Sequence, residues 1–185
     1  MIRQAGDRVE VTVTFLRMEA RPAYPRPHVP LGAPTALIAA DRPPLWYFLM
    51  LYDAVGRDYD WTDQHDAPAA DVTAFLHDPA VRLYTLVRDG WPHGFFLLDG
   101  REPGVVDLAY FGLVPEAIGR GLGTFLIQTA VHCAWDRPGT RAVTVNTNSL
   151  DHPRALPLYQ KAGFDPVRRT TYQRVLARER TPIET

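Results

Sequence analysis

A glycine-rich segment, Gly119-Arg120-Gly121-Leu122-Gly123, is the part of the chain whose residue types and spacing most directly indicate chemistry. Closely spaced glycines let the backbone turn so that several N–H groups point into one concavity. Residues 124–135 follow with helical periodicity, and the positive end of a helix favours an anion. The segment therefore predicts a phosphate-binding loop, although the same glycines taken alone are also typical of a flexible turn.

The place of these glycines in the chain argues against a dinucleotide-binding fold. Such a fold needs its glycine fingerprint in an early strand–helix–strand unit. Here three strand patterns come first, at residues 81–88, 93–98 and 105–114, and Asp89-Gly90 and Asp99-Gly100 between them are typical of hairpin turns. We therefore expect an antiparallel meander that leads into the glycine-rich segment.

The remaining elements place this unit in an α/β fold. The patterns predict a strand at residues 8–18, a helix opened by Asp41, Pro43 and Pro44 that stops at Gly56, a short helix capped by Asp71, a strand at 142–146, a helix capped by Asp151 that runs to Ala162, and a strand at 170–176. Pro157 predicts a kink in the last helix. Residues 21–34, rich in proline, predict an extended connection, and residues 177–185 a charged tail. We expect a single domain over residues 1–185 with a mostly antiparallel first half.

Composition limits the class of protein. A chain of 185 residues with 46% apolar residues suits one soluble globular domain. A net charge of −1 suggests no basic face for nucleic acid and no polybasic tail for a membrane surface. Cys133 is the only cysteine, so we expect no internal disulfide and no metal site. The charged N-terminus and the short apolar runs predict a cytoplasmic protein.

Two blocks in the second half resemble motifs of the GNAT superfamily of N-acetyltransferases. Val114-Pro115-Glu116 followed by Gly119-Arg120-Gly121-Leu122-Gly123 is similar to the family's V-x-P-x-x-[RQ]-G-x-G-x-G/A motif. Ala155-Leu156-Pro157-Leu158-Tyr159-Gln160-Lys161-Ala162-Gly163-Phe164 is similar to its A-x-x-x-Y-x-x-x-G-F motif. The resemblance covers roughly residues 81–175. It implies a GNAT-type mixed, mainly antiparallel central sheet that is flanked by helices and has splayed central strands.

The resemblance implies that acetyl-coenzyme A (acetyl-CoA) is bound along the first central strand and on the glycine-rich loop. The residues that it assigns to the coenzyme are Phe111, Gly112, Leu113, Val114, Gly119, Arg120, Gly121, Leu122, Gly123, Thr124, Asn146, His152 and Tyr159. Ile118 departs from the family pattern, which has Arg or Gln at this position. One phosphate donor is therefore missing, and Arg120 or backbone N–H groups must replace it.

The resemblance also implies the catalytic groups for direct attack of an amine on the thioester. Tyr159 matches the family's tyrosine near the coenzyme sulfur and is the predicted acid for the departing thiolate; the alternative is an aromatic that only packs helix against sheet. Asp107 stands where the histone-modifying branch has a catalytic glutamate, so it is the predicted base, acting through water. Its alternative is a solvated turn residue. His152 replaces a frequent Asn and could contact the coenzyme, act as the base, or be structural.

The family builds its amine pocket from the first two helices and the loop between them. The residues that this assigns to the substrate are Trp46, Tyr47, Tyr59, Trp61 and Asp63, with Asp60 beside them. Carboxylates next to aromatic rings suit a cation; the alternative is that the rings belong to the core and the carboxylates are only solvated.

Together these features predict an acetyl-CoA-dependent N-acetyltransferase. We expect it to act on a primary amine of a small molecule, such as an amino acid, a polyamine or an antibiotic. A protein N-terminus or lysine, or a catalytically silent acyl-CoA-binding regulator, are the alternatives. A toxin that acetylates aminoacyl-tRNA would need a basic face that the charge balance does not suggest. Members of the family often dimerise, so the resemblance allows for a homodimer, and the sequence does not indicate its interface.

Overall fold

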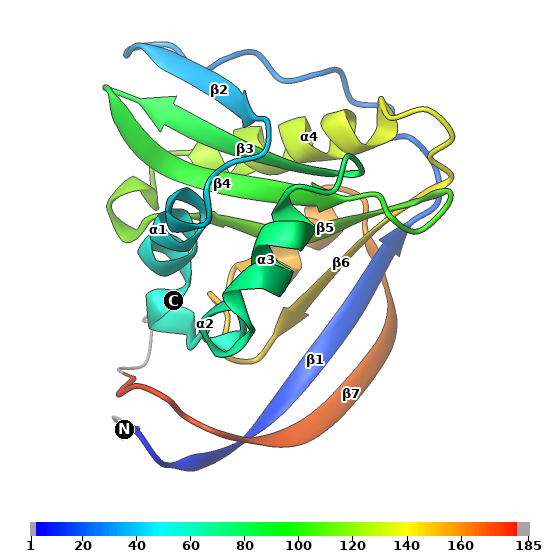
Figure 1. Cartoon of the computed structure of the whole chain (residues 1–185). Coiled ribbons are helices and arrows are strands. Elements are labelled where there is room, and N and C mark those ends of the chain that lie inside the picture. The colour runs from blue at the N-terminus through cyan, green and yellow to red at the C-terminus, as the bar shows by residue number, and fades with distance from the viewer. Residues whose placement is uncertain (1–2, 181–185) are drawn as a thin grey trace.

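A single mixed sheet of seven strands organises the computed structural model, which describes residues 3–180 (Figure 1). The strands are β1 (Arg8–Met18), β2 (Thr35–Ala40), β3 (Val81–Arg88), β4 (Trp91–Asp99), β5 (Val105–Leu113), β6 (Ala142–Asn148) and β7 (Asp165–Val175). They lie in the order β2-β3-β4-β5-β6-β1-β7. Every neighbouring pair is antiparallel except β5 and β6, which are parallel. The predicted mixed, mainly antiparallel sheet is confirmed.

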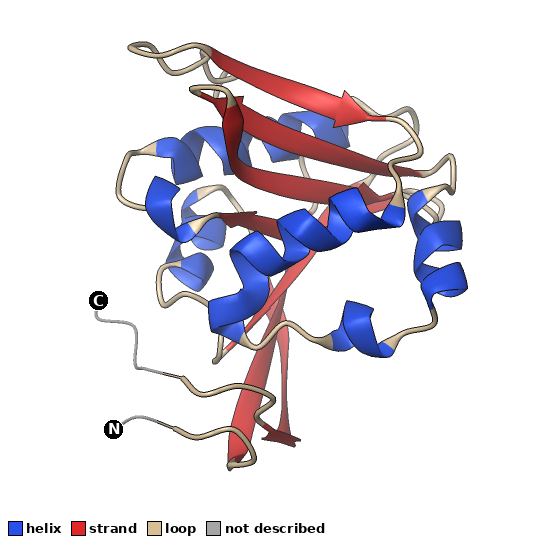
Figure 2. Cartoon of the chain, turned by 60° about the vertical axis from the view of Figure 1, so that its left-hand side comes forward, coloured by secondary structure: helices blue, strands red, loops and turns tan. Residues whose placement is uncertain are grey.

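Helices cover both faces of this sheet (Figure 2). They are α1 (Leu45–Gly56), α2 (Asp63–Asp66), α3 (Ala69–Leu76), α4 (Leu122–Trp135) and α5 (Ala155–Lys161), with 3-10 turns at Arg57–Tyr59 and Pro115–Ala117. On one face, Phe48 of α1 packs edge-on against Phe95 of β4. On the other face, α4 contacts β4, β5 and β6, and α5 packs beside α4. Central strand β4 is therefore buried on both faces from His93 to Leu98. No helix within residues 3–180 has the length and apolar character needed to cross a membrane.

The predicted meander forms as expected, and one strand was missed. β3, β4 and β5 pair in sequence, and Asp89 and Gly90 take positive φ values of 52° and 85°, as a tight hairpin turn requires. The missed strand is β2, which pairs with β3 at the edge of the sheet. Its short Thr-Ala-Leu-Ile-Ala-Ala run lacks the alternation of apolar and polar residues that marks a half-buried strand.

The proline-rich connection at residues 21–34 lies partly against α4, as an extended segment. Tyr24 donates a hydrogen bond to the carbonyl of Ala162 at 3.0 Å, and its ring meets the ring of His132 edge-on. Arg21 and Arg26 both pair with Asp136 at the end of α4. These contacts tie the connection to the helix that follows the glycine-rich loop.

The last helix begins later than predicted. α5 starts at Ala155, its N-cap residue is Arg154, and no side chain within the described part of the chain caps it. The prediction that Asp151 caps this helix is therefore wrong, because that carboxylate is bonded elsewhere. Pro157 consequently lies in the first turn, where a missing N–H costs no helical hydrogen bond, so the predicted kink loses its cause. Likewise, α3 begins after Pro68, and Asp71 lies within its first turn.

The two central strands part after a short contact. β5 and β6 are paired only at Val105–Ala142, Val106–Val143 and Asp107–Thr144. Beyond Asp107, β5 continues to Leu113, while β6 diverges from it and remains paired with β1 along its other edge. β1 lies between β6 and β7, and these strands extend together from the rest of the sheet (Figure 1). The predicted splay is therefore present, and it opens a space between the two halves of the sheet.

Candidate active site

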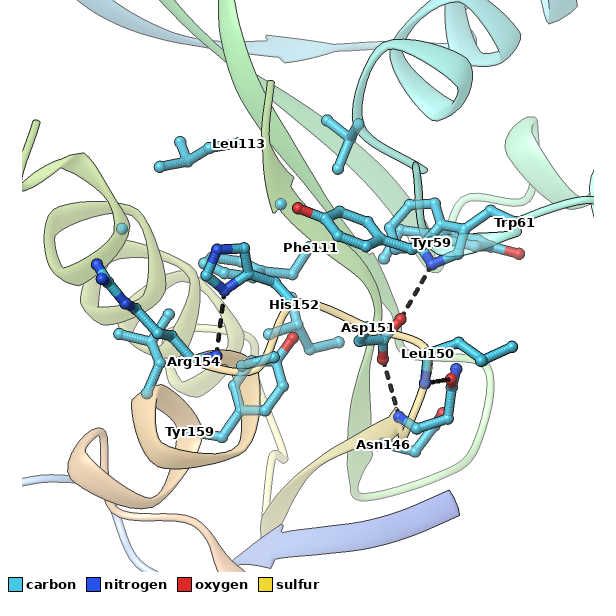
Figure 3. A pocket seen from close by; sticks show the side chains of 18 of the residues that line it. Tyr59, Trp61, Phe111, Leu113, Asn146, Leu150, Asp151, His152, Arg154 and Tyr159 are labelled. Atoms are coloured by element: carbon cyan, nitrogen blue, oxygen red, sulfur yellow. Dashed lines mark hydrogen bonds between the residues drawn. The ribbon is translucent and has the colours of Figure 1, made fainter. Parts of the chain in front are cut away.

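A cavity of about 600 Å³ opens in the splay between β5 and β6 (Figure 3). Its walls come from β5, the glycine-rich loop, the start of α4, the end of β6, the segment leading into α5, the stretch around Trp61, and β7. Most of the predicted site residues meet here. Those that line the cavity are Phe111, Gly112, Leu113, Gly119, Gly121, Gly123, Thr124, Asn146, His152 and Tyr159 on the coenzyme list, and Tyr59, Trp61 and Asp63 on the substrate list.

The other predicted residues lie outside the lining. Val114 and Leu122 are buried in the core, next to the loop that they flank. Trp46 is 68% exposed on the outer side of α1, and the Tyr47 hydroxyl is 2.9 Å from the hydroxyl of Thr85. α1 is turned so that Phe48, Leu51, Tyr52 and Val55 face the sheet. Arg120 is exposed and does not line the cavity. The glycine-rich loop therefore faces the cavity with its backbone and not with the Arg120 guanidinium.

The glycine-rich loop has the backbone that a phosphate cradle needs. Gly119 and Gly121 have φ values of 82° and 75°, in the left-handed region that favours glycine. A Cβ atom at either position would meet no atom within 4 Å, so the concave side of the loop is open. Gly121 is also the N-cap residue of α4, whose first N–H groups have no partner within the helix. These features fit the pyrophosphate of a coenzyme.

Tyr159 reaches the cavity from α5 and is only 5% exposed. Its ring packs against Phe111 and Phe164, with centroids 5.8 Å and 6.2 Å away. Burial raises the pKa of the Tyr159 phenol far above its usual range, and the negative charges of Asp151 and Asp107 raise it further. The phenol therefore stays protonated at neutral pH and can donate a proton. Tyr159 both packs helix against sheet and faces the cavity.

Asp107 lies at the point where β5 and β6 part. Thr144 donates a hydrogen bond from Oγ1 to Oδ1 of Asp107 at 2.5 Å, and Asp99 is its partner on β4. Burial raises the pKa of the Asp107 carboxyl, the Thr144 hydrogen bond opposes this, and the charges of Asp99 and Glu102 add to it. The carboxyl does not line the cavity. Its role as base stays a prediction, and any proton would have to reach it through water.

His152 lines the cavity next to Tyr59, with ring centroids 6.3 Å apart. Its Nδ1 accepts a hydrogen bond from the backbone N–H of Arg154 at 3.1 Å (Figure 3). Burial and the nearby charge of Arg154 lower the pKa of the imidazole. His152 is therefore a neutral imidazole at neutral pH, with its Nδ1 occupied.

One wall of the cavity, here called the aromatic wall, consists of Tyr59, Trp61 and Tyr110. Trp61 contacts Tyr52 and Tyr110, with centroids 5.3 Å and 5.7 Å away. Tyr110 of β5 also lines the cavity, although the sequence analysis did not include it among the site residues. Tyr172 also lines the cavity from β7, and nothing in the sequence indicates that this strand lies beside it.

A buried ion pair holds the aromatic wall in place. Asp60 has a positive φ of 60° and a fully buried side chain, and Arg174 of β7 donates from Nε to its Oδ2 at 2.8 Å. Arg174 also donates to the Asp60 carbonyl at 2.6 Å, and the Ala177 N–H donates to Asp60 Oδ1 at 3.0 Å. Asp60 therefore fastens the stretch between Tyr59 and Trp61 to the last strand. Asp63 is exposed and 3.8 Å from the same guanidinium.

Asp151 is the functional candidate that sequence analysis missed. Thr147 Oγ1 and the Asn148 N–H donate to its Oδ2 at 2.7 Å and 2.9 Å. Trp61 Nε1 donates to its Oδ1 at 3.3 Å from the opposite wall (Figure 3). The sequence showed only an Asp ahead of a helix, which is typical of a cap.

The chain belongs to the acetyltransferase (GNAT) family, whose model matches residues 48–164, more than half of its length. No curated protein matches the chain.

Solved structures share the fold at low identity. A tandem GNAT protein from the clavulanic acid biosynthesis pathway is 18% identical, with a TM-score of 0.65 over 98% of this chain and 56% of its own. A GCN5-related N-acetyltransferase from Sphaerobacter thermophilus is 18% identical, with a TM-score of 0.59 over 100% and 55%. An aminoglycoside N-acetyltransferase in complex with CoA is 21% identical, with a TM-score of 0.55 over 77% and 95%. This chain therefore spans little more than half the length of the first two proteins.

Proposed function

We propose that this protein transfers an acetyl group from acetyl-CoA to a primary amine of a small molecule. The observation that carries the proposal is that three features line one cavity: an open glycine-rich loop, a buried and protonated Tyr159, and an aromatic wall with carboxylates beside it. The first element suits a nucleotide phosphate, the second a departing thiolate, and the third an amine.

The donor would be held by backbone rather than by charged side chains. Gly119, Gly121 and Thr124 would hold the pyrophosphate with the N-terminus of α4, because Ile118 contributes only apolar surface to this cavity. β5 between Ala109 and Leu113 lines the splay and would carry the pantetheine arm along its unpaired edge. The acetyl-CoA thioester supplies the activated acyl group.

Two proton movements complete the proposed reaction. An ammonium has no lone pair, so the amine must lose a proton before its nitrogen bonds to the acyl carbon and the carbon–sulfur bond breaks. Asp107 would receive that proton through water, and its raised pKa makes it a stronger base than an ordinary carboxylate. Tyr159 would give its phenol proton to the thiolate and regain one from solvent.

A small acceptor fits the size and chemistry of the cavity. A volume of about 600 Å³ lies in the range of small-molecule sites and must also hold the end of the pantetheine arm. Trp61, Tyr59 and Tyr110 line the cavity with aromatic rings, and Asp63 and Asp151 line it with negative charge. These features favour a small cationic amine over a lysine in a folded protein.

The test is binding followed by turnover on one sample. Calorimetry with acetyl-CoA should show one site, and a thiol-release assay over amino acids, polyamines, arylalkylamines and aminoglycosides should find at least one acceptor. Acetyl-CoA binding without thiol release from any amine would support the silent regulator instead. Absence of acetyl-CoA binding would refute the proposed function.

A further inference from the structure

We propose that Asp151 binds the ammonium group of the acceptor, so that the enzyme selects amines that enter the cavity as cations. This inference rests on the proposed function, because it names how that function recognises its substrate. Three observations support it: neutral donors fix the Asp151 carboxylate in place, the carboxylate has no ion-pair partner among the described residues, and aromatic residues line the cavity beside it.

The Asp151 carboxylate is fixed from two sides of the cavity. Thr147 and Asn148, at the end of β6, hold Oδ2, and the Trp61 indole N–H holds Oδ1 from the aromatic wall. Because the donors come from segments far apart in the sequence, the carboxylate cannot turn away without breaking contacts on both sides. A carboxylate oxygen has two lone pairs, and Oδ1 accepts only the one bond from Trp61 among the residues described. One acceptor position therefore stays available for a ligand.

The three donors are neutral, so they leave the negative charge of Asp151 in place. Across residues 3–180, Arg174 pairs with Asp60 and Asp63, whereas Asp151 takes part in no ion pair. The charge of Arg180 acts on Asp151 through space, but its guanidinium donates a hydrogen bond to the carbonyl of Leu150 at 2.5 Å and forms no ion pair with Asp151. A half-buried carboxylate that lacks an ion-pair partner is free to pair with an ammonium ion, and a hydrogen bond between two charged groups is stronger than one between neutral groups.

The surroundings of Asp151 favour an ammonium ion over other ligands. Trp61 and Tyr59 line the same cavity, and aromatic rings attract cations. His152, the neighbouring residue, is a neutral imidazole and so does not compete for the carboxylate. Asp151 is also the carboxylate whose charge raises the pKa of Tyr159 most, after burial. An ammonium ion bound at Asp151 would therefore interact electrostatically with Tyr159, the proposed proton donor for the thiolate.

A purely structural role for Asp151 makes a different prediction. If the carboxylate only held the loop between β6 and α5, its loss would change stability and coenzyme binding, but not the preference for a charged over an uncharged ligand. Ligand pairs that differ only in charge separate the two roles.

The experiment measures binding of 2-phenylethylamine and its neutral analogue 2-phenylethanol by calorimetry, with and without CoA. Wild-type protein should bind the amine about 10- to 100-fold more tightly than the alcohol, the usual worth of a hydrogen bond to a charged group. Asp151→Asn should reduce this preference to within about threefold, while Asp151→Glu should keep part of it. The control Asp58→Asn removes an exposed carboxylate that precedes Tyr59 in the chain but does not line the cavity, and it should keep the full preference.

Each outcome decides the inference. An Asp151→Asn protein that keeps the wild-type preference, or a wild-type protein without one, refutes it. Thermal unfolding and CoA binding of the variants show whether the fold survives; if Asp151→Asn unfolds, the preference of Asp151→Glu decides in the same way. Wild-type thiol release with an unchanged preference in Asp151→Asn would refute this inference and leave the proposed function standing. If the wild-type protein does not bind CoA, the proposed function is refuted. The comparison of amine and alcohol binding without CoA then still tests the role of Asp151.

Discussion

The indole of Trp61 lies directly on the backbone of Gly56, so closely that a Cβ atom at position 56 would overlap the ring. The backbone N–H of Trp61 also donates to the Gly56 carbonyl at 3.2 Å. Gly56 is the last residue of α1, and its φ of −89° is open to any residue. The glycine is thus required by the ring and not by the backbone. One contact at the end of α1 sets where the Trp61 side chain enters the cavity.

Gly56→Ala should therefore displace Trp61. The added methyl group forces the ring to move, which should lower the free energy of unfolding by about 1–3 kcal/mol, as is usual for overpacking. Urea unfolding measures this effect. In a Trp61→Ala background the same change should be neutral or stabilising, because alanine favours a helix by about 1 kcal/mol over glycine. Equal costs in both backgrounds would contradict the proposed contact.

Tyr159→Phe should lower kcat by about ten- to a thousandfold, because it removes the phenol proton while keeping the packing on Phe111 and Phe164. Coenzyme affinity by calorimetry should change little. The matched control is Tyr84→Phe, a stacked tyrosine of β3 that does not line the cavity. Wild-type kcat in Tyr159→Phe would remove this residue from the mechanism.

Gly121→Val should abolish coenzyme binding. Valine is poorly tolerated at a φ of 75°, and its side chain would fill the open side of the loop. Gly139→Val is the control, since Gly139 has a φ of 79°, equally open space and no place in the cavity lining. Both variants should lose similar stability, and only the first should lose acetyl-CoA binding in calorimetry. Normal binding by Gly121→Val would overturn the assignment of the loop.

Asp107→Asn should suppress turnover at neutral pH and recover in part at alkaline pH, where more of the amine is already free. A constant ratio of mutant to wild-type rate across pH would exclude Asp107 as the base. The same variant should keep or gain stability at pH 7. Because burial raises the folded-state pKa of Asp107, its contribution to stability is present at acid pH and lost as the pH rises through that pKa. Asparagine keeps an acceptor for Thr144 without the charge.

The protein should lose stability steeply above about pH 10, where tyrosines of the unfolded chain ionise. Burial raises the pKa of Tyr159 and Tyr110 in the folded state, so both stay protonated there while the unfolded chain releases their protons. Each such tyrosine contributes a slope of about 1.4 kcal/mol per pH unit. Urea unfolding between pH 8 and pH 11 should show this fall, and Tyr159→Phe should fall less steeply. Parallel curves would mean that Tyr159 ionises in the folded protein.

The sequence predicts the site where its signals are local. The glycine-rich loop and Tyr159 each belong to a short sequence pattern, so the sequence alone was enough to place both at the cavity. Asp151 was misjudged because its partner Trp61 lies far away in sequence, and only the closed fold brings them together. The same holds for Asp60 and Arg174, whose types indicate a solvated loop and a charged strand until β7 is placed.

Strand β2 and the exposed side of α1 show a second limit. A short edge strand buries little, so its residues need no alternation, and Thr35–Ala40 gave no signal. On α1, aromatic residues occur on several sides of the helix, and composition alone does not tell that Tyr52 faces the sheet while Trp46 faces solvent. Packing decides which of several similar rings reaches the cavity.

The position of β1 between β6 and β7 governs when the protein can fold. β1 is made first, yet both of its partners are strands from the last third of the chain, with Val13 pairing to Asn148 on one side and Thr170 on the other. Such long-range pairing slows folding, because distant segments must meet before any contact rewards them. On the ribosome, β1 must wait as an unpaired apolar strand while the β3–β5 meander can already form. The cavity is lined by β6, β7 and the segment between them. It therefore forms in one late step of chain synthesis and not gradually as the chain lengthens.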